Sequence, residues 1–494
     1  MSDSLKFCRP EEVGVHPSWV EDYVNTVNRQ RKMCHSFIMM RKGKIFAEGY
    51  WKPFHKDRLH RMYSVSKSFV SGAVGFLIGE GKLSLSDKIV DLLPEYLPKD
   101  KEVHPYIKEM TVEHLLTMAT CHKVTTYAFT RENWIDTFFD PPYEPDHKAG
   151  EFFRYDTSAA YTLDVIVEKI TGKSFLEYLK DKALRELGFS ENAWCVEAPE
   201  GFGWGGSGVE CTTRDLLIFT MLFANGGKVN GKQYLSEEYV KAATSKQIDN
   251  YSGTLNAVSG RGYGYQIWLT RDNGFAFLGM GGQLGVVIPH KDIIFVCTSD
   301  TQGDADGYHG FVDVLFDTVI NKIESDSIEY DDASFERLEN ILESLEVSFP
   351  AGNAYSPMAE KINGRTYELE EKKMGMKSVT VEFNEHMGVL TFETDRGTKR
   401  FPFGVGRYSD TFIPETHYSG RRIWTPKGER YRCLNGVAWI SEDTLLMRTY
   451  VIDDYLGNMT TTLTFNDDRV DLVITKTAEW FLDEYPGTAT GKLK

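Results

Sequence analysis

Three short segments hold residues suited to covalent catalysis. In the first, Ser64-Val65-Ser66-Lys67, a spacing of three residues puts Ser64 and Lys67 on one face of a helix, so the lysine amine can reach the serine hydroxyl. Ser64 would lie at the helix N-terminus, where N–H groups and the helix dipole stabilise an oxyanion. We expect burial in this apolar helix to lower the pKa of Lys67, which would make it a general base near neutral pH. The alternative is that Ser64 only caps the helix and Lys67 is a solvated charge.

The other two segments could move protons and bind an oxyanion. Tyr155-Asp156-Thr157 begins a helical pattern, and a phenol beside a cation could pass a proton between nucleophile and leaving group. Met280-Gly281-Gly282-Gln283 lies between two strand patterns, where glycines allow close backbone approach and the Gln283 N–H could form half of an oxyanion hole. The alternatives are a packed tyrosine at a helix start and a glycine-rich hairpin turn.

The elements that must position these segments follow from hydrophobic periodicity. Residues 36–51 read as a β-hairpin, and residues 64–80 read as a helix buried on most faces. Further helices are predicted at 112–119, 158–171, 174–186, 213–224 and 311–323, and further strands at 263–270, 274–278, 284–289 and 293–299. Strands at both ends of a helical middle predict an α+β fold with an antiparallel sheet whose first and last parts meet.

An acidic stretch after residue 325 marks a domain boundary. Beyond residue 354, short alternating segments such as 378–383, 387–394, 444–451 and 460–465 are separated by turn signals, which is typical of a small antiparallel barrel or sandwich. We therefore predict a catalytic domain at 1–325, an acidic linker with one helix at 326–354, and a small β-barrel at 355–494.

The composition excludes several classes of protein. Of 494 residues, 41% are hydrophobic and 26% charged, as in ordinary globular proteins. The formal net charge of −16 has the wrong sign for binding a phosphate backbone or an anionic lipid surface, so we expect no nucleic-acid and no membrane partner. The segment MSDSLKFCRPEEVG has neither a basic nor an apolar signal region, so we expect a soluble, cytoplasmic protein.

Metal and cofactor sites are not indicated. The seven cysteines are scattered and form no CxxC pair, so neither disulfides nor a zinc site is expected. The chain also has no HExxH, GxSxG, Walker or GxGxxG motif. We expect no metal and no cofactor.

The order and spacing of the three segments resemble the serine β-lactamase and penicillin-binding protein superfamily. More narrowly, the chain looks like the class C β-lactamase-related esterases, D-aminopeptidases and aminohexanoate-oligomer hydrolases. Supporting phrases between residues 12 and 300 are GVHPSWVEDY, RKGKIFAEGYW, MYSVSKSF, GKLSLSDKIVDLLPE, TVEHLLTMAT, GVECTTRDLLIFTMLFANGG, GYGYQIW and GMGGQLGVVIP. The resemblance implies a β-lactamase-like antiparallel sheet flanked by helices, with an all-helical region. It also makes the C-terminal barrel similar to the lipocalin-like appendages of some relatives, which would restrict substrate size or mediate contacts in a homo-oligomer.

The resemblance also implies a role for each motif residue. Ser64 matches the nucleophile, Lys67 its base and Tyr155 the proton relay, while the N–H groups of Ser64 and Gln283 match the oxyanion hole. Met280, Gly281 and Gly282 occupy the substrate-binding strand motif that is Lys-Thr-Gly or His-x-Gly in many relatives, and Thr157 stands where many relatives have Asn.

We therefore expect a serine hydrolase that cleaves an ester, amide or short peptide through an acyl-Ser64 intermediate, with a small molecule or short peptide as its substrate. The alternative is a non-catalytic binding or scaffold protein that retains this fold but, with Thr157 and Met280 at two motif positions, has lost the chemistry.

Overall fold

The computed structural model describes residues 5–251, 260–304, 307–370 and 374–494 and divides them into two compact units. The first unit comprises the chain up to Val347 together with Arg421–Trp424, and the second comprises Ser348–Gly420 and Thr425–Lys494. In the described residues, no helix is long and apolar enough to cross a membrane.

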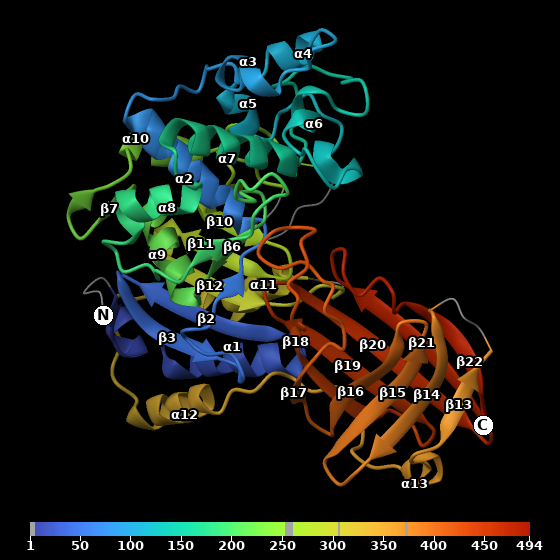
Figure 1. The fold of residues 1–494 in the computed structure, drawn as a ribbon. Helices are drawn as coiled ribbons and strands as arrows, with labels where there is room; N and C mark the ends of the chain where they lie inside the picture. The colour runs from blue at the N-terminus through green and yellow to red at the C-terminus, as the bar shows by residue number, and fades with distance from the viewer. Residues whose placement is uncertain (1–4, 252–259, 305–306, 371–373) are drawn as a thin grey trace. The chain divides into compact units, whose positions relative to one another are not determined.

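A seven-stranded sheet forms the centre of the first unit (Figure 1). Its strands, in spatial order, are β1 (Lys6–Phe7), β3 (Lys44–Tyr50), β2 (Cys34–Arg41), β12 (Ile293–Ser299), β11 (Gln283–Ile288), β10 (Phe275–Gly279) and β9 (Trp268–Leu269). The β2–β12 pair is antiparallel and joins the start of the unit to its end, with Phe37 opposite Cys297. The predicted meeting of the first and last strands is thus confirmed.

Helices cover both faces of this sheet. On one face, α1 (Pro17–Arg29) and α11 (His309–Thr318) bury Tyr23 and Phe311 against the sheet residues Phe37 and Phe295 in a single hydrophobic core. On the other face, α9 (Thr213–Ala224) packs against β2, β11 and β12, and α2 (Val65–Gly79) packs against β10. Phe69 of α2 stacks on Phe219 of α9 with ring centroids 3.8 Å apart, so these two helices share one packed layer.

The middle of the first unit is largely helical, as the sequence predicts. Its helices are α3 (Ile89–Leu92), α4 (Pro105–Lys108), α5 (Val112–Leu116), α6 (Asp136–Phe139), α7 (Thr157–Thr171), α8 (Phe175–Leu179) and α10 (Glu237–Ala243). Two small sheets accompany them: β4 (His60–Arg61), β6 (Val209–Cys211) and β5 (Trp194–Cys195), and β7 (Lys228–Val229) with β8 (Lys232–Gln233). α12 (Asp332–Glu343), in the acidic stretch, also belongs to this unit.

One predicted strand is mostly wrong. Residues 263–270 form a strand only at Trp268–Leu269, and Tyr263 contributes isolated bridges to Ile248 and Trp268. Gln266 has a φ of 60°, in the left-handed region, and a strand cannot continue through such a residue. The apolar run is explained instead by burial, since Tyr263 and Ile267 are buried in loop conformations.

The second unit is a β-barrel. After α13 (Met358–Ile362), its strands are β13 (Thr366–Leu369), β14 (Met376–Phe383), β15 (Met387–Thr394), β16 (Gly397–Val405), β17 (Ser409–Phe412), β18 (Arg432–Trp439), β19 (Thr444–Ile452), β20 (Leu456–Asn466), β21 (Arg469–Thr477) and β22 (Gly487–Leu493). Neighbouring strands are antiparallel except where β16 pairs in parallel with β18, and this pairing closes a ring of nine strands with β17 attached to β18. Buried and exposed residues alternate along β21, as expected of a barrel wall, and the predicted barrel is confirmed.

Candidate active site

Ser64 lies in a tight turn between β4 and α2. Met62 N donates to Val209 O of β6, which fixes the chain just before the turn, and Tyr63 then adopts a φ of 47°. Ser64 is the N-cap residue of α2, and its side chain makes no capping hydrogen bond. The helix start is therefore where the sequence places it, but the serine hydroxyl is not used as a cap.

The Lys67 side chain lies one helical turn after Ser64 on α2 and forms a hydrogen bond with the Ser64 hydroxyl. Its side chain is 1% exposed, and Nζ lies 2.9 Å from Ser64 Oγ and 2.5 Å from the carbonyl oxygen of Gly206. A neutral amine that donates one N–H to Gly206 O can turn its lone pair toward Oγ and accept the hydroxyl proton. The solvated-charge alternative for Lys67 is thereby ruled out by its burial.

Tyr155 is the third polar side chain at this point. Its ring lies 5.0 Å from Lys67 Nζ and stacks on Trp268 with centroids 5.7 Å apart. Burial raises the pKa of the Tyr155 phenol above its usual value of 10, while a hydrogen bond with Ser64 acts in the opposite direction. The phenol therefore stays protonated at neutral pH and can donate a proton rather than remove one.

The tip of the β10–β11 hairpin meets the nucleophile turn. A Cβ added to Gly279 would lie closer than 3.0 Å to the carbonyl oxygen of Met62, so the strand end touches the chain two residues before Ser64. The following Met280-Gly281-Gly282-Gln283 segment is thus brought to the same region, as the hypothesis of an oxyanion hole requires. Met280, at the tip, is 37% exposed.

The Gln283 side chain braces this hairpin tip from behind. Its Nε2 donates to Met280 O (2.9 Å) and Ser299 O (2.8 Å), and Ser299 Oγ donates to Gly281 O (2.6 Å). Gly282 has a φ of 95°, and an added Cβ there would collide with Ser299 Oγ, so only glycine fits. The sequence pointed only to the Gln283 backbone, and the bracing role of its side chain was missed.

Thr157 lies at the edge of this group. It is the first residue of α7, its amide donates to Thr125 Oγ1 at 3.0 Å, and its methyl group faces Gly206, where an added Cβ would collide with it. The position at which many relatives have Asn is therefore next to the carbonyl that holds Lys67.

Sequence reasoning missed three other residues here. Gly206 accepts from Lys67, Trp268 stacks on Tyr155, and Tyr308 contributes to the raised pKa of Tyr155 and approaches Gly282. The glycine-rich phrase GWGGSG at 203–208 was a usable signal for Gly206, whereas Tyr308 and Trp268 have no local pattern that distinguishes them from core residues.

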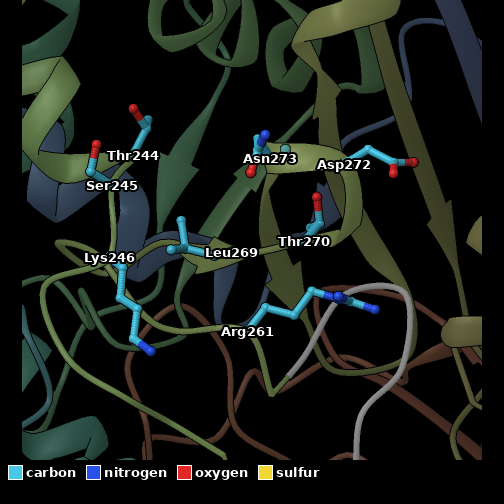
Figure 2. Close-up of a pocket in the computed structure, with 9 residues that line it drawn as sticks. Thr244, Ser245, Lys246, Arg261, Leu269, Thr270, Asp272 and Asn273 are labelled. Atoms are coloured by element: carbon cyan, nitrogen blue, oxygen red, sulfur yellow. The ribbon is translucent and has the colours of Figure 1, made fainter.

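A pocket of about 520 Å³ lies elsewhere on the sheet, around β9 and the opposite end of β10 (Figure 2). Its lining residues are Thr244, Ser245, Lys246, Arg261, Leu269, Thr270, Asp272, Asn273 and Gly274. None of the residues predicted to be catalytic belongs to it, so this pocket is separate from the Ser64 group.

One cluster in the second unit has metal-ligand chemistry. Glu415, His417 and Glu484 bring their ligand atoms within 4.8 Å of one another. Arg396 and Lys399 already form ion pairs with these carboxylates, so the negative charge is balanced by side chains and no metal site is inferred.

Comparison with known proteins gives consistent matches for the first unit. The sequence profile described as Beta-lactamase matches residues 23–313. The 6-aminohexanoate-dimer hydrolase of Paenarthrobacter ureafaciens is 26% identical over 294 residues, which cover 56% of this chain and 75% of that protein. Among solved structures, a family VIII carboxylesterase superposes with a TM-score of 0.51 at 14% identity, covering 64% of this chain and 98% of that one. A penicillin-binding protein homologue from Caulobacter crescentus gives a TM-score of 0.50 at 16% identity, covering 63% and 98%.

Proposed function

Because the chain belongs to the beta-lactamase family, a family of hydrolases, we propose that it is a serine hydrolase that forms an acyl-Ser64 intermediate. The observation that carries this proposal is the position of the buried Lys67 amine between Ser64 Oγ and Gly206 O, at 2.9 and 2.5 Å. An amine held in this way is suited to activate a serine hydroxyl.

The proposed reaction has two halves. Ser64 Oγ attacks the substrate carbonyl carbon while its proton passes to Lys67 Nζ, and the N–H groups of Ser64 and Gln283 bind the oxyanion that forms. The Tyr155 hydroxyl then gives a proton to the leaving alkoxide or amine and regains one from Lys67. Water attacks the acyl-Ser64 ester in the second half, which releases the acid and restores Ser64.

The substrate class is proposed to be an ester, amide or short peptide. Met280 and Gly281 offer neither a cation nor a hydroxyl group at the strand motif, so neither side chain can pair with a substrate carboxylate. The names of two similar proteins, a 6-aminohexanoate-dimer hydrolase and a carboxylesterase, agree with cleavage of an amide or an ester bond.

Labelling with a fluorophosphonate probe tests the proposal, because only an activated serine reacts. We expect one adduct in the intact mass, located at Ser64 by peptide mapping, and loss of labelling in Ser64→Ala and Lys67→Met. Lys180→Met is a matched control, since Lys180 is also buried and also bonds a main-chain carbonyl, that of Ala193, yet makes no contact with Ser64 in the described structure.

Hydrolysis of p-nitrophenyl butyrate by the same variants measures turnover. Ser64→Ala and Lys67→Met should each lose several orders of magnitude in kcat, and the double variant little more, because the two residues act as one unit. An unlabelled wild-type protein that hydrolyses nothing would instead support the non-catalytic scaffold.

A further inference from the structure

The loop that presents Gly206 to Lys67 is held by two carboxyl groups, that of Asp164, which is buried, and that of Glu168, which is half-buried. This glycine loop, Gly203–Gly208, donates its Gly203 amide to Glu168 Oε1 at 2.9 Å and its Gly205 amide to Asp164 Oδ2 at 3.2 Å. Asp164 and Glu168 are one helical turn apart on α7, so both face the loop from the same side. An added Cβ at Gly203 would lie 3.2 and 3.3 Å from the two carboxyl groups, so they converge on this residue.

The far side of the glycine loop is bonded to two basic side chains. Gly206 O accepts from Lys67 Nζ at 2.5 Å, and the next carbonyl, Ser207 O, accepts from Arg61 Nε at 2.9 Å. Lys67 and Arg61 are both buried. The loop is therefore bonded through its amides on one side and through its carbonyls on the other, and its position fixes where the Lys67 amine lies.

Shielding these carboxyl groups from water costs free energy, most of all for the fully buried Asp164. Burial raises the pKa of Asp164 well above its usual value and that of Glu168 to about 7. Asp164 Oδ1 is buried and makes no hydrogen bond within the described residues. Apolar side chains would fill this space at lower cost, so packing alone does not account for the pair.

We propose that Asp164 and Glu168 are positioning residues that fix the glycine loop, so that Gly206 O holds the Lys67 amine against Ser64 Oγ. This inference rests on the proposed function, because it assigns a purpose to the carboxyl pair only if Lys67 activates Ser64. The inference also assigns two roles to α7. Its first turn begins at Thr157, just after Tyr155, and its later turns carry the two carboxyl groups that hold the glycine loop. A single helix thereby sets both the tyrosine and the lysine relative to the nucleophile.

Pairs of substitutions separate the hydrogen bonds from the charge. Glu168→Gln and Asp164→Asn keep an oxygen acceptor for the loop amides, whereas Glu168→Met and Asp164→Leu remove it at similar volume. Asp215→Leu is the matched control, because Asp215 is also a buried carboxyl that accepts two main-chain amides, those of Ser190 and Thr212, and it does not contact the glycine loop.

Two measurements follow on the full-length variants. Hydrogen–deuterium exchange of the peptide that contains 203–208 measures how well the loop amides are protected. The rate of fluorophosphonate labelling at Ser64, together with kcat and KM for p-nitrophenyl butyrate, measures the reactivity of the nucleophile. In Glu168→Met and Asp164→Leu we expect the loop amides to exchange faster. The labelling rate and kcat should be about tenfold to hundredfold lower, with KM unchanged, because a reacting group is misplaced by about an ångström. The Gln and Asn variants should recover most of the rate, and Asp215→Leu should keep the wild-type labelling rate even if its melting temperature falls.

Gly203→Ala perturbs the same hydrogen bonds without removing either carboxyl group. The added methyl would lie 3.1 Å from Phe175 and within 3.3 Å of both carboxyl groups, so the loop and these side chains must separate by a few tenths of an ångström, which strains the hydrogen bonds between them. It provides the test if Asp164→Leu and Glu168→Met do not fold, and the same faster exchange and slower labelling are expected.

Faster loop exchange with wild-type labelling and kcat would overturn the proposal, as would unchanged exchange in Glu168→Met, Asp164→Leu or Gly203→Ala. Failure of the proposed function looks different: the wild-type protein itself would then show no adduct at Ser64, whatever the exchange of the loop.

Discussion

Replacing Gly279 with alanine tests whether the end of β10 must touch the nucleophile turn. The new Cβ would lie closer than 3.0 Å to Met62 O, whereas ordinary contact begins at 3.4 Å, so strand and turn must separate by at least about 0.4 Å. Because a 1 Å misplacement of reacting groups can cost about 10²-fold in rate, we expect Gly279→Ala to lower kcat for p-nitrophenyl butyrate about tenfold to hundredfold. Overpacking of this kind also costs about 1–3 kcal/mol of stability.

Gly79→Ala is the matched control, since Gly79 is the last residue of the helix that carries Ser64 and an added Cβ there meets nothing within 4 Å. It should leave kcat unchanged and raise stability by about 0.5–1 kcal/mol, because alanine favours a helix over glycine. Thermal unfolding monitored by circular dichroism establishes that both variants are folded. A folded Gly279→Ala protein with the wild-type kcat would refute the reasoning, because the contact with Met62 would then have no bearing on the nucleophile.

Three further predictions concern protonation and substrate choice. Because the raised pKa of Tyr155 keeps its phenol protonated, the rise of kcat/KM through neutral pH should reflect deprotonation of Lys67. Tyr155→Phe should therefore lower kcat/KM about 10²- to 10⁴-fold and leave the midpoint of the rise unchanged. A shifted midpoint would make Tyr155 the base. Burial lowers the pKa of His60 to about 3 and that of His35 well below 6.5, and their rings are joined by a 2.7 Å hydrogen bond. At these two histidines the unfolded chain therefore binds more protons below about pH 6.5, which lowers the stability of the fold between pH 7 and pH 5. Because carboxyl groups with a raised pKa act in the opposite direction, the quantity to compare is the urea-unfolding free energy of His35→Gln with that of the wild type: it should gain on the wild type as the pH falls from 7 to 5, and a constant difference would contradict the assignment. Finally, p-nitrophenyl butyrate should have a higher kcat/KM than nitrocefin, because Met280 offers no cation to a β-lactam carboxylate. The missing contact should lower kcat/KM for nitrocefin roughly 10- to 150-fold. A higher value for nitrocefin would place another cation at that position.

Local spacing was sufficient for the part of the site that lies on one element. Ser64 and Lys67 are three residues apart along α2, so their proximity follows from helix geometry, and the 2.9 Å distance from Lys67 Nζ to Ser64 Oγ agrees with it. Gly206 lies 139 residues from Lys67, and no periodicity within either segment indicates that they meet. Such contacts depend on how the elements pack, which the sequence of one segment does not specify.

The strand predicted at 263–270 failed for a related reason. An apolar run predicts burial, but it does not distinguish a strand from a buried loop. The left-handed φ of Gln266 is maintained by tertiary hydrogen bonds, since its Nε2 donates to Leu115 O and its amide to Leu116 O of α5. The backbone conformation is thus fixed by a partner 150 residues away.

The brace behind the β10–β11 hairpin has a consequence for how this protein can diversify. Gln283 and Ser299 donate to the backbone oxygens of Met280, Gly281 and Gly282, so these hydrogen bonds do not depend on the Met280 side chain. Residue 280 can therefore change while the main chain beside Ser64 keeps its shape. On the proposed function, in which residue 280 lies beside the substrate, we expect a library randomised at this one codon to vary selectivity on an intact scaffold, and duplicated copies of the gene to acquire new substrates by the same single step.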